Sequence, residues 1–191
     1  ANSGYITTKY LAQQYILEQV EQNKLPAVVV NPTFMIGPND SKPSSGKVLL
    51  YGVQNKLLLY PPGGKNFVYV MDVCKAIARA ISHGKIGDTY LLAGHNLSYG
   101  EFFKLLNRVS GKKRIMVRTP VLFLKIGGIL GSCLQKITGI RVPLNASNAF
   151  LLCVHNYYSG KKSERELGVV YTPMDVAIKK ALTWFKEHNY Y

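Results

Sequence analysis

The sequence lacks an unbroken apolar run of bilayer length, which takes about 20 residues. Its apolar runs, such as PAVVV (26–30) and VLFLKIGGILGSCL (121–134), are interrupted by or bounded by lysine, glycine or proline. No charged start followed by an apolar stretch is present, so the sequence shows no secretory signal. These absences predict a cytoplasmic protein with no membrane span.

Cysteine and histidine are also scarce. The three cysteines (Cys74, Cys133 and Cys153) are odd in number and lack the spacing of a metal site, and the four histidines are dispersed. We therefore expect no bound metal. The cysteines are predicted to be reduced, buried thiols of a cytoplasmic protein.

Acidic residues are few, with 10 Asp and Glu against 24 Lys and Arg, which gives a formal net charge of +14. Such a balance suits an anionic partner, which could be nucleic acid, a phosphate-bearing small molecule or an anionic membrane surface. However, the positive charges are spread along the chain, and no basic stretch is interleaved with aromatics as in a single-strand groove. Nucleic acid is therefore not an expected partner.

What is present is a globular composition, with 191 residues of which 47% are hydrophobic. This length allows one domain with its own core, or a large part of a bigger protein. Periodicity predicts a helix over 5–22, short strands in PAVVV, KLLLYPPGG, NFVYVMD and GDTYLLAG, and further helices. Ser44 or Ser45 is placed to cap a short helix that ends at Val53, and Asp72 to cap a helix over 73–82.

Ser98 and Glu101 form a capping-box pattern that Gly111 closes, so a helix is predicted between them. Beyond Thr119 the pattern is mostly helical, with helices expected within 119–139, 144–156 and 172–189. The fold class predicted from this order is α/β. It consists of the second half of a doubly wound parallel sheet with a smaller, mostly helical lobe.

Two residues at the beginning of the sequence could carry chemistry. Tyr5 and Lys9 lie four residues apart, so on a helix they share one face. A free tyrosine is a poor acid or base at neutral pH, and a nearby ammonium group favours the phenolate form. By itself the pattern also fits a half-buried tyrosine beside a solvated lysine.

The context of this pair resembles the extended short-chain dehydrogenase/reductase family. Tyr-x-x-x-Lys opens a long helix, and about twenty residues later the sequence reads VVVNPTFMIGP, with the family's Pro-x-x-x-x-Gly-Pro spacing over 32–38. NFVYVMDVCKAIARAI (66–81), GDTYLLAGHNLSYGEFFKLL (87–106) and the closing segment 157–185 follow in the family's order. The resemblance therefore covers the whole chain.

The resemblance implies an NAD(P)-dependent enzyme with a Rossmann-like fold. Tyr5 would be the catalytic acid/base, and Lys9 would tune it and hold the ribose of NAD or NADP. Pro32 and Thr33 would also lie beside the cofactor, and the loop up to Pro38 would border the nicotinamide and the substrate. Phe34, Gly37 and Lys65 would contact substrate, with Lys65 in a place where sugar-nucleotide epimerases often carry an arginine.

The family's Gly-rich dinucleotide fingerprint is absent from the sequence. The nearest glycine cluster, Gly127 to Gly131, lies inside an apolar helix and is interpreted as a site of close helix packing. The family's catalytic serine normally lies about a dozen residues before the tyrosine. The resemblance therefore predicts that the chain is the C-terminal portion of a longer enzyme, with a missing N-terminal half-domain as its partner. Residues 1–95 would complete the NAD(P)-binding domain, with interleaved substrate-lobe segments, and 96–191 would form mainly the substrate lobe and closing helices.

The leading functional prediction is hydride transfer to or from a small-molecule alcohol or carbonyl substrate, as in dihydroflavonol reductases or hydroxysteroid dehydrogenases. A nucleotide-sugar epimerase or dehydratase of the same family is the first alternative. The second, from another class, is a non-catalytic binding or structural module derived from this fold. The resemblance also makes a homodimer an expectation, and the chain by itself is expected to be inactive.

Overall fold

The computed structural model describes residues 4–140, 142 and 144–191. Its helices are α1 (Gly4–Asn23), α2 (Lys47–Gln54), α3 (Val70–His83), α4 (Tyr99–Ser110), α5 (Val121–Thr138), α6 (Ala146–Cys153), α7 (Lys161–Leu167) and α8 (Met174–Glu187). Its strands are β1 (Val29–Pro32), β2 (Phe34–Ile36), β3 (Leu57–Tyr60), β4 (Gly64–Tyr69), β5 (Thr89–Leu92), β6 (His95–Ser98), β7 (Ile115–Arg118) and β8 (His155–Asn156). Helices and strands alternate through most of the chain, as an α/β fold requires.

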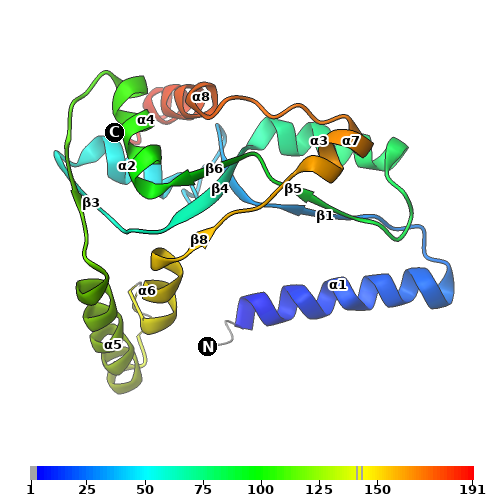
Figure 1. Ribbon diagram of the computed structural model, residues 1–191, viewed down its shortest axis with the longest axis horizontal. Coiled ribbons are helices and arrows are strands. Elements are labelled where there is room, and N and C mark those ends of the chain that lie inside the picture. Colours follow the sequence, from blue (N-terminus) through cyan, green and yellow to red (C-terminus); the bar gives the residue numbers. More distant parts are fainter. Residues whose placement is uncertain (1–3, 141, 143) are drawn as a thin grey trace.

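The strands form three small sheets (Figure 1). β1 pairs in parallel with β5, and β3 pairs in parallel with β7. The third sheet has β4 at its centre, with β2 and β8 parallel to it and β6 antiparallel. Parallel neighbours need long crossover connections, and the helices of this chain lie in those connections.

The larger core lies between the β4 sheet and the helices α2, α4 and α8. Phe67 of β4 stacks on Phe102 of α4 with ring centroids 4.4 Å apart, and both side chains are fully buried. Phe185 of α8 is also fully buried in this cluster. Each such ring removes a large apolar area from water, so this cluster carries most of the hydrophobic stabilisation of the chain.

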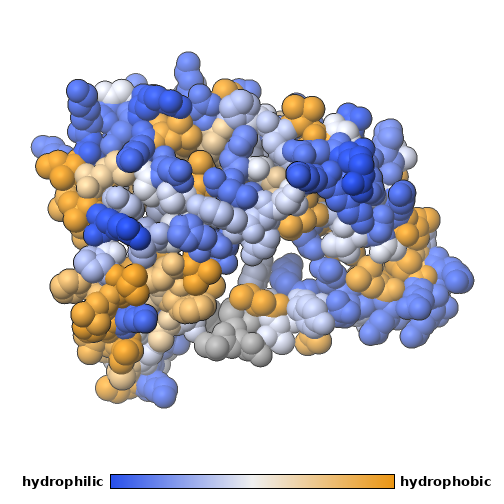
Figure 2. Space-filling view, viewed as in Figure 1, coloured by the Kyte–Doolittle hydropathy of each residue, from blue (hydrophilic) through white to orange (hydrophobic). Residues whose placement is uncertain are grey.

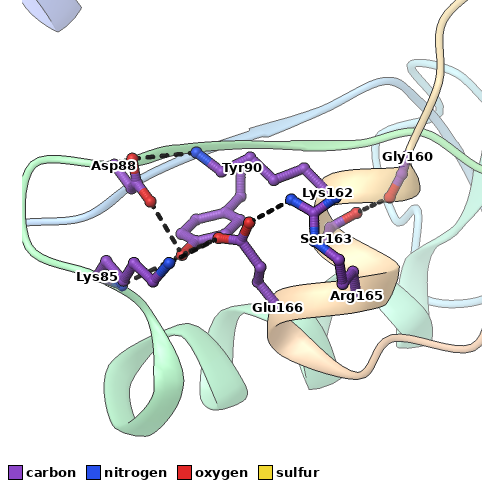
Figure 3. Close-up of polar contacts among 8 residues, drawn as sticks. All are labelled: Lys85, Asp88, Tyr90, Gly160, Lys162, Ser163, Arg165 and Glu166. Atoms are coloured by element: carbon purple, nitrogen blue, oxygen red, sulfur yellow. Dashed lines mark hydrogen bonds and ion pairs between the residues drawn. The ribbon is translucent and has the colours of Figure 1, made fainter.

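A second core joins β5 to α3 and α7 around the buried ring of Tyr90. The Tyr90 hydroxyl lies 3.2 Å from a Glu166 carboxylate oxygen, and Lys162 pairs with Asp88 at 3.0 Å (Figure 3). Arg165 pairs with Glu166 as well. Hydrogen bonds from Lys162 and from Arg165 hold the pKa of the Asp88 and Glu166 carboxyls, respectively, below their usual range. The Tyr90–Glu166 and Lys162–Asp88 contacts both run between α7 and β5 or the residue just before it, so this cluster anchors α7 to β5.

The helix of the predicted capping box forms as expected. The Ser98 side chain accepts a hydrogen bond from the Glu101 backbone N–H, and the Glu101 carboxylate accepts one from the Ser98 backbone N–H. Gly111 ends α4 in the left-handed conformation, with φ of 66°. The glycine cluster of α5 also packs closely, as predicted. A side chain at Gly131 would collide with the backbone carbonyl of Leu144.

Two predicted caps are wrong. α3 begins at Val70, so Asp72 lies inside its first turn, where its carboxylate accepts hydrogen bonds from the Thr172 backbone N–H (2.6 Å) and hydroxyl (2.9 Å). α2 has no side-chain cap. Instead, Asp40 accepts hydrogen bonds from the backbone N–H groups of Ser44 and Gly46 before that helix. Asp72 thus holds the segment before α8 instead of capping α3, and Asp40, not Ser44 or Ser45, holds the segment before α2.

The prediction about the cysteines is also wrong in part. All three are free, but Cys74 and Cys133 are exposed and Cys153 is half-buried. Cys74 lies on the outer side of α3, and Cys133 lies on α5, a helix with little cover in this chain. Their number and spacing predicted free thiols, which the structure has, but carried no information about which face of a helix each cysteine occupies.

Candidate active site

Tyr5 and Lys9 lie in the first turns of α1, one helical turn apart. The Tyr5 side chain is exposed (71%), and Lys9 is exposed as well. No residue of α1 is buried in the described part of the chain. The helix is joined to β1 by a hydrogen bond of 2.9 Å from the Asn31 side-chain amide to Gln13 Oε1. The phenol and the ammonium group are therefore open to a ligand or to further protein.

The segment that follows β1 leads across to the central sheet. The Thr33 backbone N–H donates to the Leu92 carbonyl at 3.1 Å, which extends the pairing of β1 with β5. The Thr33 hydroxyl lies 2.7 Å from Asn66 Oδ1 and 3.1 Å from the same Leu92 carbonyl. Because both partners are acceptors, the single hydroxyl proton is committed within the protein. Pro32, beside it, is exposed at the end of β1.

Asn66 belongs to a network of amides that the sequence did not reveal. It is buried (2% exposed), and its side-chain amide donates to Asn96 Oδ1 at 2.7 Å. Asn96 in turn donates to the Tyr158 carbonyl and accepts from the Tyr158 backbone N–H, both at 3.0 Å. The network fixes the strands beside Thr33 and ties them to the segment before α7. The one signal of this network in the sequence is Asn66, a polar residue next to the apolar run FVYV.

Phe34 and Lys65 meet, although they are 31 residues apart in sequence. β2 lies beside β4 with Phe34 opposite Phe67, so Lys65 and Phe34 share one face of the sheet. The Lys65 Nζ lies 4.5 Å from the centre of the Phe34 ring, a cation–π contact. Burial lowers the pKa of the Lys65 ammonium, and none of the ion pairs among the described residues includes it. A partly desolvated cation without a carboxylate partner is suited to binding an anionic or carbonyl oxygen.

Gly37 ends β2 where the chain passes the beginning of α3. A side chain at this position would collide with the Val70 side chain and would lie 3.3 Å from the Tyr69 ring. Only glycine therefore lets the loop approach α3 so closely. Met35, Gly37 and Pro38 help to line a cavity of about 220 Å³ that opens beside the loop.

The predicted site residues thus fall into two groups. Thr33, Phe34, Gly37 and Lys65 lie around the β2–β4 pair, whereas Tyr5 and Lys9 lie on α1. Within the described chain, no hydrogen bond, ion pair or ring contact joins the two groups. They are connected through β1, which contacts α1 through Asn31 and leads directly into Thr33.

A larger hollow, of about 480 Å³, lies elsewhere, between the C-terminal ends of α2, α4 and α8. Its lining includes Arg114, whose guanidinium donates to the Val53 carbonyl at 3.2 Å and to the Ser110 hydroxyl at 2.9 Å. None of the predicted site residues lines it. The arginine is occupied in joining α4 to α2, so we assign this hollow no part in the chemistry.

Comparison with known proteins identifies relatives of this chain. The sequence profile of the NAD dependent epimerase/dehydratase family matches residues 1–93. A candidate dihydroflavonol 4-reductase of Synechocystis sp. is 28% identical over 98% of this chain and 56% of its own length. Sterol demethylase protein B of Methylococcus capsulatus is 27% identical over 98% of this chain and 58% of its own length.

Among solved structures, the crystal structure of gox2253 superimposes with a TM-score of 0.78 at 30% identity, covering 96% of this chain and 56% of that one. The chain therefore spans somewhat more than half the length of the relatives it matches. The superposition on gox2253 supports an α/β, Rossmann-like fold for this chain. From its sequence and its fold, this chain belongs to the NAD-dependent epimerase/dehydratase family, the extended short-chain dehydrogenases/reductases.

Proposed function

We propose that the natural protein is an NAD(P)-dependent oxidoreductase in which Tyr5 exchanges the proton and Lys9 holds the cofactor ribose. The bound dinucleotide would supply the hydride chemistry, while the protein orients the reactants and moves the proton. The substrate would carry a hydroxyl or carbonyl group at the reacting carbon. Reduction of a dihydroflavonol-like or steroid-like carbonyl is the specific form we favour.

The observation that carries this proposal is the position of Tyr5 and Lys9. Both are exposed, one turn apart, on the helix that leads into β1 and the 32–38 segment. Neither side chain has a structural role in the described chain that would explain the pairing. A phenol one helical turn from an ammonium group is a suitable proton donor for an alkoxide that forms in the transition state.

The remaining predicted residues have distinct roles in this proposal. Pro32 and Thr33 would border the nicotinamide, with Thr33 contributing its backbone and methyl group, because its hydroxyl is committed to Asn66 and Leu92. Phe34 and Gly37 would form the substrate side of the pocket. Lys65 would place its partly desolvated ammonium near a polar oxygen of the substrate.

A nucleotide-sugar epimerase or dehydratase is the second candidate. Its substrate carries a diphosphate, which an arginine binds with two parallel hydrogen bonds and which Lys65 could meet only as a point charge. The same geometry therefore favours a substrate without a diphosphate. Turnover of a carbonyl compound with NADH or NADPH, in the absence of any nucleotide sugar, would separate the two.

We further propose that the natural protein includes a preceding half-domain that carries the pyrophosphate-binding loop. β1 pairs with β5 alone among the described strands, and α1 has no buried residue, so both have surfaces that a further part of the sheet could cover. Residues 1–95 would complete the cofactor domain, and 96–191 would supply mainly the substrate lobe. If the chain were a non-catalytic module, these surfaces would need another partner.

Lys9→Met in the full-length protein tests the proposal. Losing a charged hydrogen bond of about 1.5–3 kcal/mol should raise the KM for the dinucleotide by roughly 10–100-fold and lower turnover as well. Lys75→Met is the matched control, since Lys75 is also an exposed helical lysine, on α3. Equal cofactor KM values in the two variants would show that Lys9 is an ordinary surface charge and would refute its role.

A further inference from the structure

The helix pair α5 and α6 presents a wide apolar face to solvent. α5 is 18 residues long with a mean hydropathy of 1.3, and by length and composition it is apolar enough to cross a membrane, yet only 11% of it is buried. Phe123 is 68% exposed, Leu130 64% and Ile137 83%. Figure 2 shows hydrophobic side chains gathered over this part of the molecule. A core helix of a soluble domain would instead bury most of these residues.

The exposed residues form a continuous stripe. At 100° per residue, they occupy an arc of about 120° that contains no charged residue. Its members are Leu122, Phe123, Ile126, Leu130, Leu134 and Ile137. An apolar patch of this extent on a surface marks an interaction site.

The other side of α5 already has its partner. Gly128 and Gly131 are buried, and side chains there would collide with Ala149 of α6 and with the Leu144 carbonyl. The small residues of α5 therefore serve to bring α6 close. The apolar stripe points away from the contact with α6, so a different partner would have to bind it.

The charges around the apolar stripe indicate which kind of partner binds it. Residues 102–163 contain no aspartate or glutamate but eleven lysines and arginines. Lys125 and Lys136 are exposed on α5 at one border of the stripe. A second copy of this surface would bring like charges together, whereas an anionic lipid surface attracts them.

The attachment of α5 and α6 to the rest of the protein limits how this helix pair could bind a membrane. The Thr119 backbone N–H donates to the Tyr60 carbonyl just before α5, and β8 just after α6 pairs with β4. Both ends are thus fixed to the body of the protein, with the two helices extending from it as a hairpin (Figure 1). α6 has 8 residues, a length of about 12 Å, which is too short to cross a hydrocarbon core of about 30 Å.

We propose that the α5–α6 hairpin docks on an anionic membrane surface without spanning it. The apolar stripe enters the boundary between headgroups and acyl chains, and Lys125 and Lys136 extend to lipid phosphates. The enzyme is then a peripheral membrane protein whose lobe 96–191 rests on the lipid.

Two exposed cysteines allow a direct test in the full-length protein. Cys133 lies on α5 within the arc of the stripe, and Cys74 lies on α3, outside the hairpin. Each is labelled with a polarity-sensitive fluorophore in a variant in which every other cysteine is replaced by serine. Mixed with vesicles of phosphatidylcholine and roughly one-third phosphatidylglycerol, the label on Cys133 should shift to the blue and the label on Cys74 should not.

Vesicle sedimentation of substituted proteins separates the apolar and charge contributions. Phe123→Ser with Leu130→Ser should lower vesicle partitioning by at least about tenfold. Ile81→Ser with Ile86→Ser, an apolar pair outside the hairpin that is at least as exposed, should leave it unchanged. Lys125→Gln with Lys136→Gln, or omission of the anionic lipid, should lower it by roughly 10–30-fold. Thermal unfolding checks that each variant is folded.

Several results would overturn the proposal. One is the absence of a Cys133 shift with anionic vesicles, and another is an equal shift at Cys74. If the Phe123/Leu130 variant instead turned a dimer into a monomer, and the unsubstituted protein ignored vesicles, the occupant would be a second copy. Strong hydrogen-exchange protection of the stripe in lipid-free monomer would assign the cover to another segment of the same protein.

Discussion

α1 and α5 are both long helices with exposed apolar residues, but their surfaces differ in kind. On α1, exposed tyrosines such as Tyr5 and Tyr10 are mixed with lysine, glutamine and glutamate. On α5 the exposed residues form a stripe free of charge, bordered by lysines. The exposure of apolar residues therefore does not by itself indicate the kind of partner that a surface binds. The pattern of polar residues within the surface does indicate it.

The mixed surface of α1 is suited to a protein partner and to chemistry. Tyrosines bring an apolar ring and a polar hydroxyl, which need hydrogen-bond partners when covered. The uniform stripe of α5 offers no hydrogen bonds and suits a lipid. We therefore expect the two helices to respond to different additions: α1 to the proposed preceding half-domain, and α5 to an anionic membrane.

The largest expected effect concerns dinucleotide binding. The chain of 191 residues should show no heat of binding with NAD or NADP in calorimetry, although it carries Tyr5 and Lys9. Most of the affinity would come from the pyrophosphate loop at a helix N-terminus in the preceding half-domain. Light scattering on the same sample should show self-association through the open edge of β1. Tight dinucleotide binding by a monomer of this chain would contradict the proposal that the preceding half-domain supplies most of the affinity.

Hydrogen exchange should separate the two helices. In the chain alone, amides of α1 should exchange rapidly, because the helix has no buried residue. In the full-length protein their protection should rise by roughly 10²-fold or more, while that of α5 stays the same until anionic vesicles are added. An equal rise in the protection of α1 and α5 when the half-domain is present would contradict the proposal that the two helices bind different partners.

Gly131→Val should open the hairpin. The new side chain would overlap the Leu144 carbonyl, and overpacking of this kind costs about 1–3 kcal/mol. Denaturant unfolding followed by hydrogen exchange should place the loss in α5 and α6. Ile137→Val, at an exposed site, should change the free energy of unfolding by less than about 0.5 kcal/mol. Equal stability of the two variants would show that α5 does not need its glycine face.

Ser98→Ala is expected to have the smallest effect, a loss of about 1 kcal/mol from an uncapped α4. The capping hydrogen bonds from Ser98 hold the pKa of Glu101 below its usual value. A carboxyl with a lowered folded-state pKa stabilises the protein at neutral pH, and this contribution is lost as the pH falls through that pKa. The stability difference between Ser98→Ala and the unsubstituted chain should therefore shrink on acidification. A difference that grows with acid would contradict the capping box.

Local signals in the sequence predicted local structure well. The capping box at Ser98 depends on a residue three positions away, and the glycines of α5 pack against a segment that follows soon afterwards in the chain, at Leu144. Asp72 was misread because its partner, Thr172, lies 100 residues later in the chain. The strands β6 and β7 were missed, since HNLS and IMVR are short and owe their pairing to β4 and β3.

The candidate site shows the same limit. The sequence indicated Phe34 and Lys65 separately through the family resemblance. Their contact exists because β2 pairs with β4, a tertiary fact that no spacing encodes. Likewise, the commitment of the Thr33 hydroxyl to Asn66 depends on two segments 33 residues apart.

The central claim, that Tyr5 is the acid/base of an NAD(P)-dependent enzyme, is tested most directly by turnover of Tyr5→Phe beside Tyr10→Phe in the full-length protein. Both tyrosines are exposed on α1, and each substitution removes only a hydroxyl. Tyr5→Phe should keep cofactor binding while kcat falls by roughly 10²–10⁴-fold, the contribution of a general acid/base. Tyr10→Phe should retain near-normal kcat. Near-normal turnover by Tyr5→Phe, or an equal loss in both variants, would contradict the account.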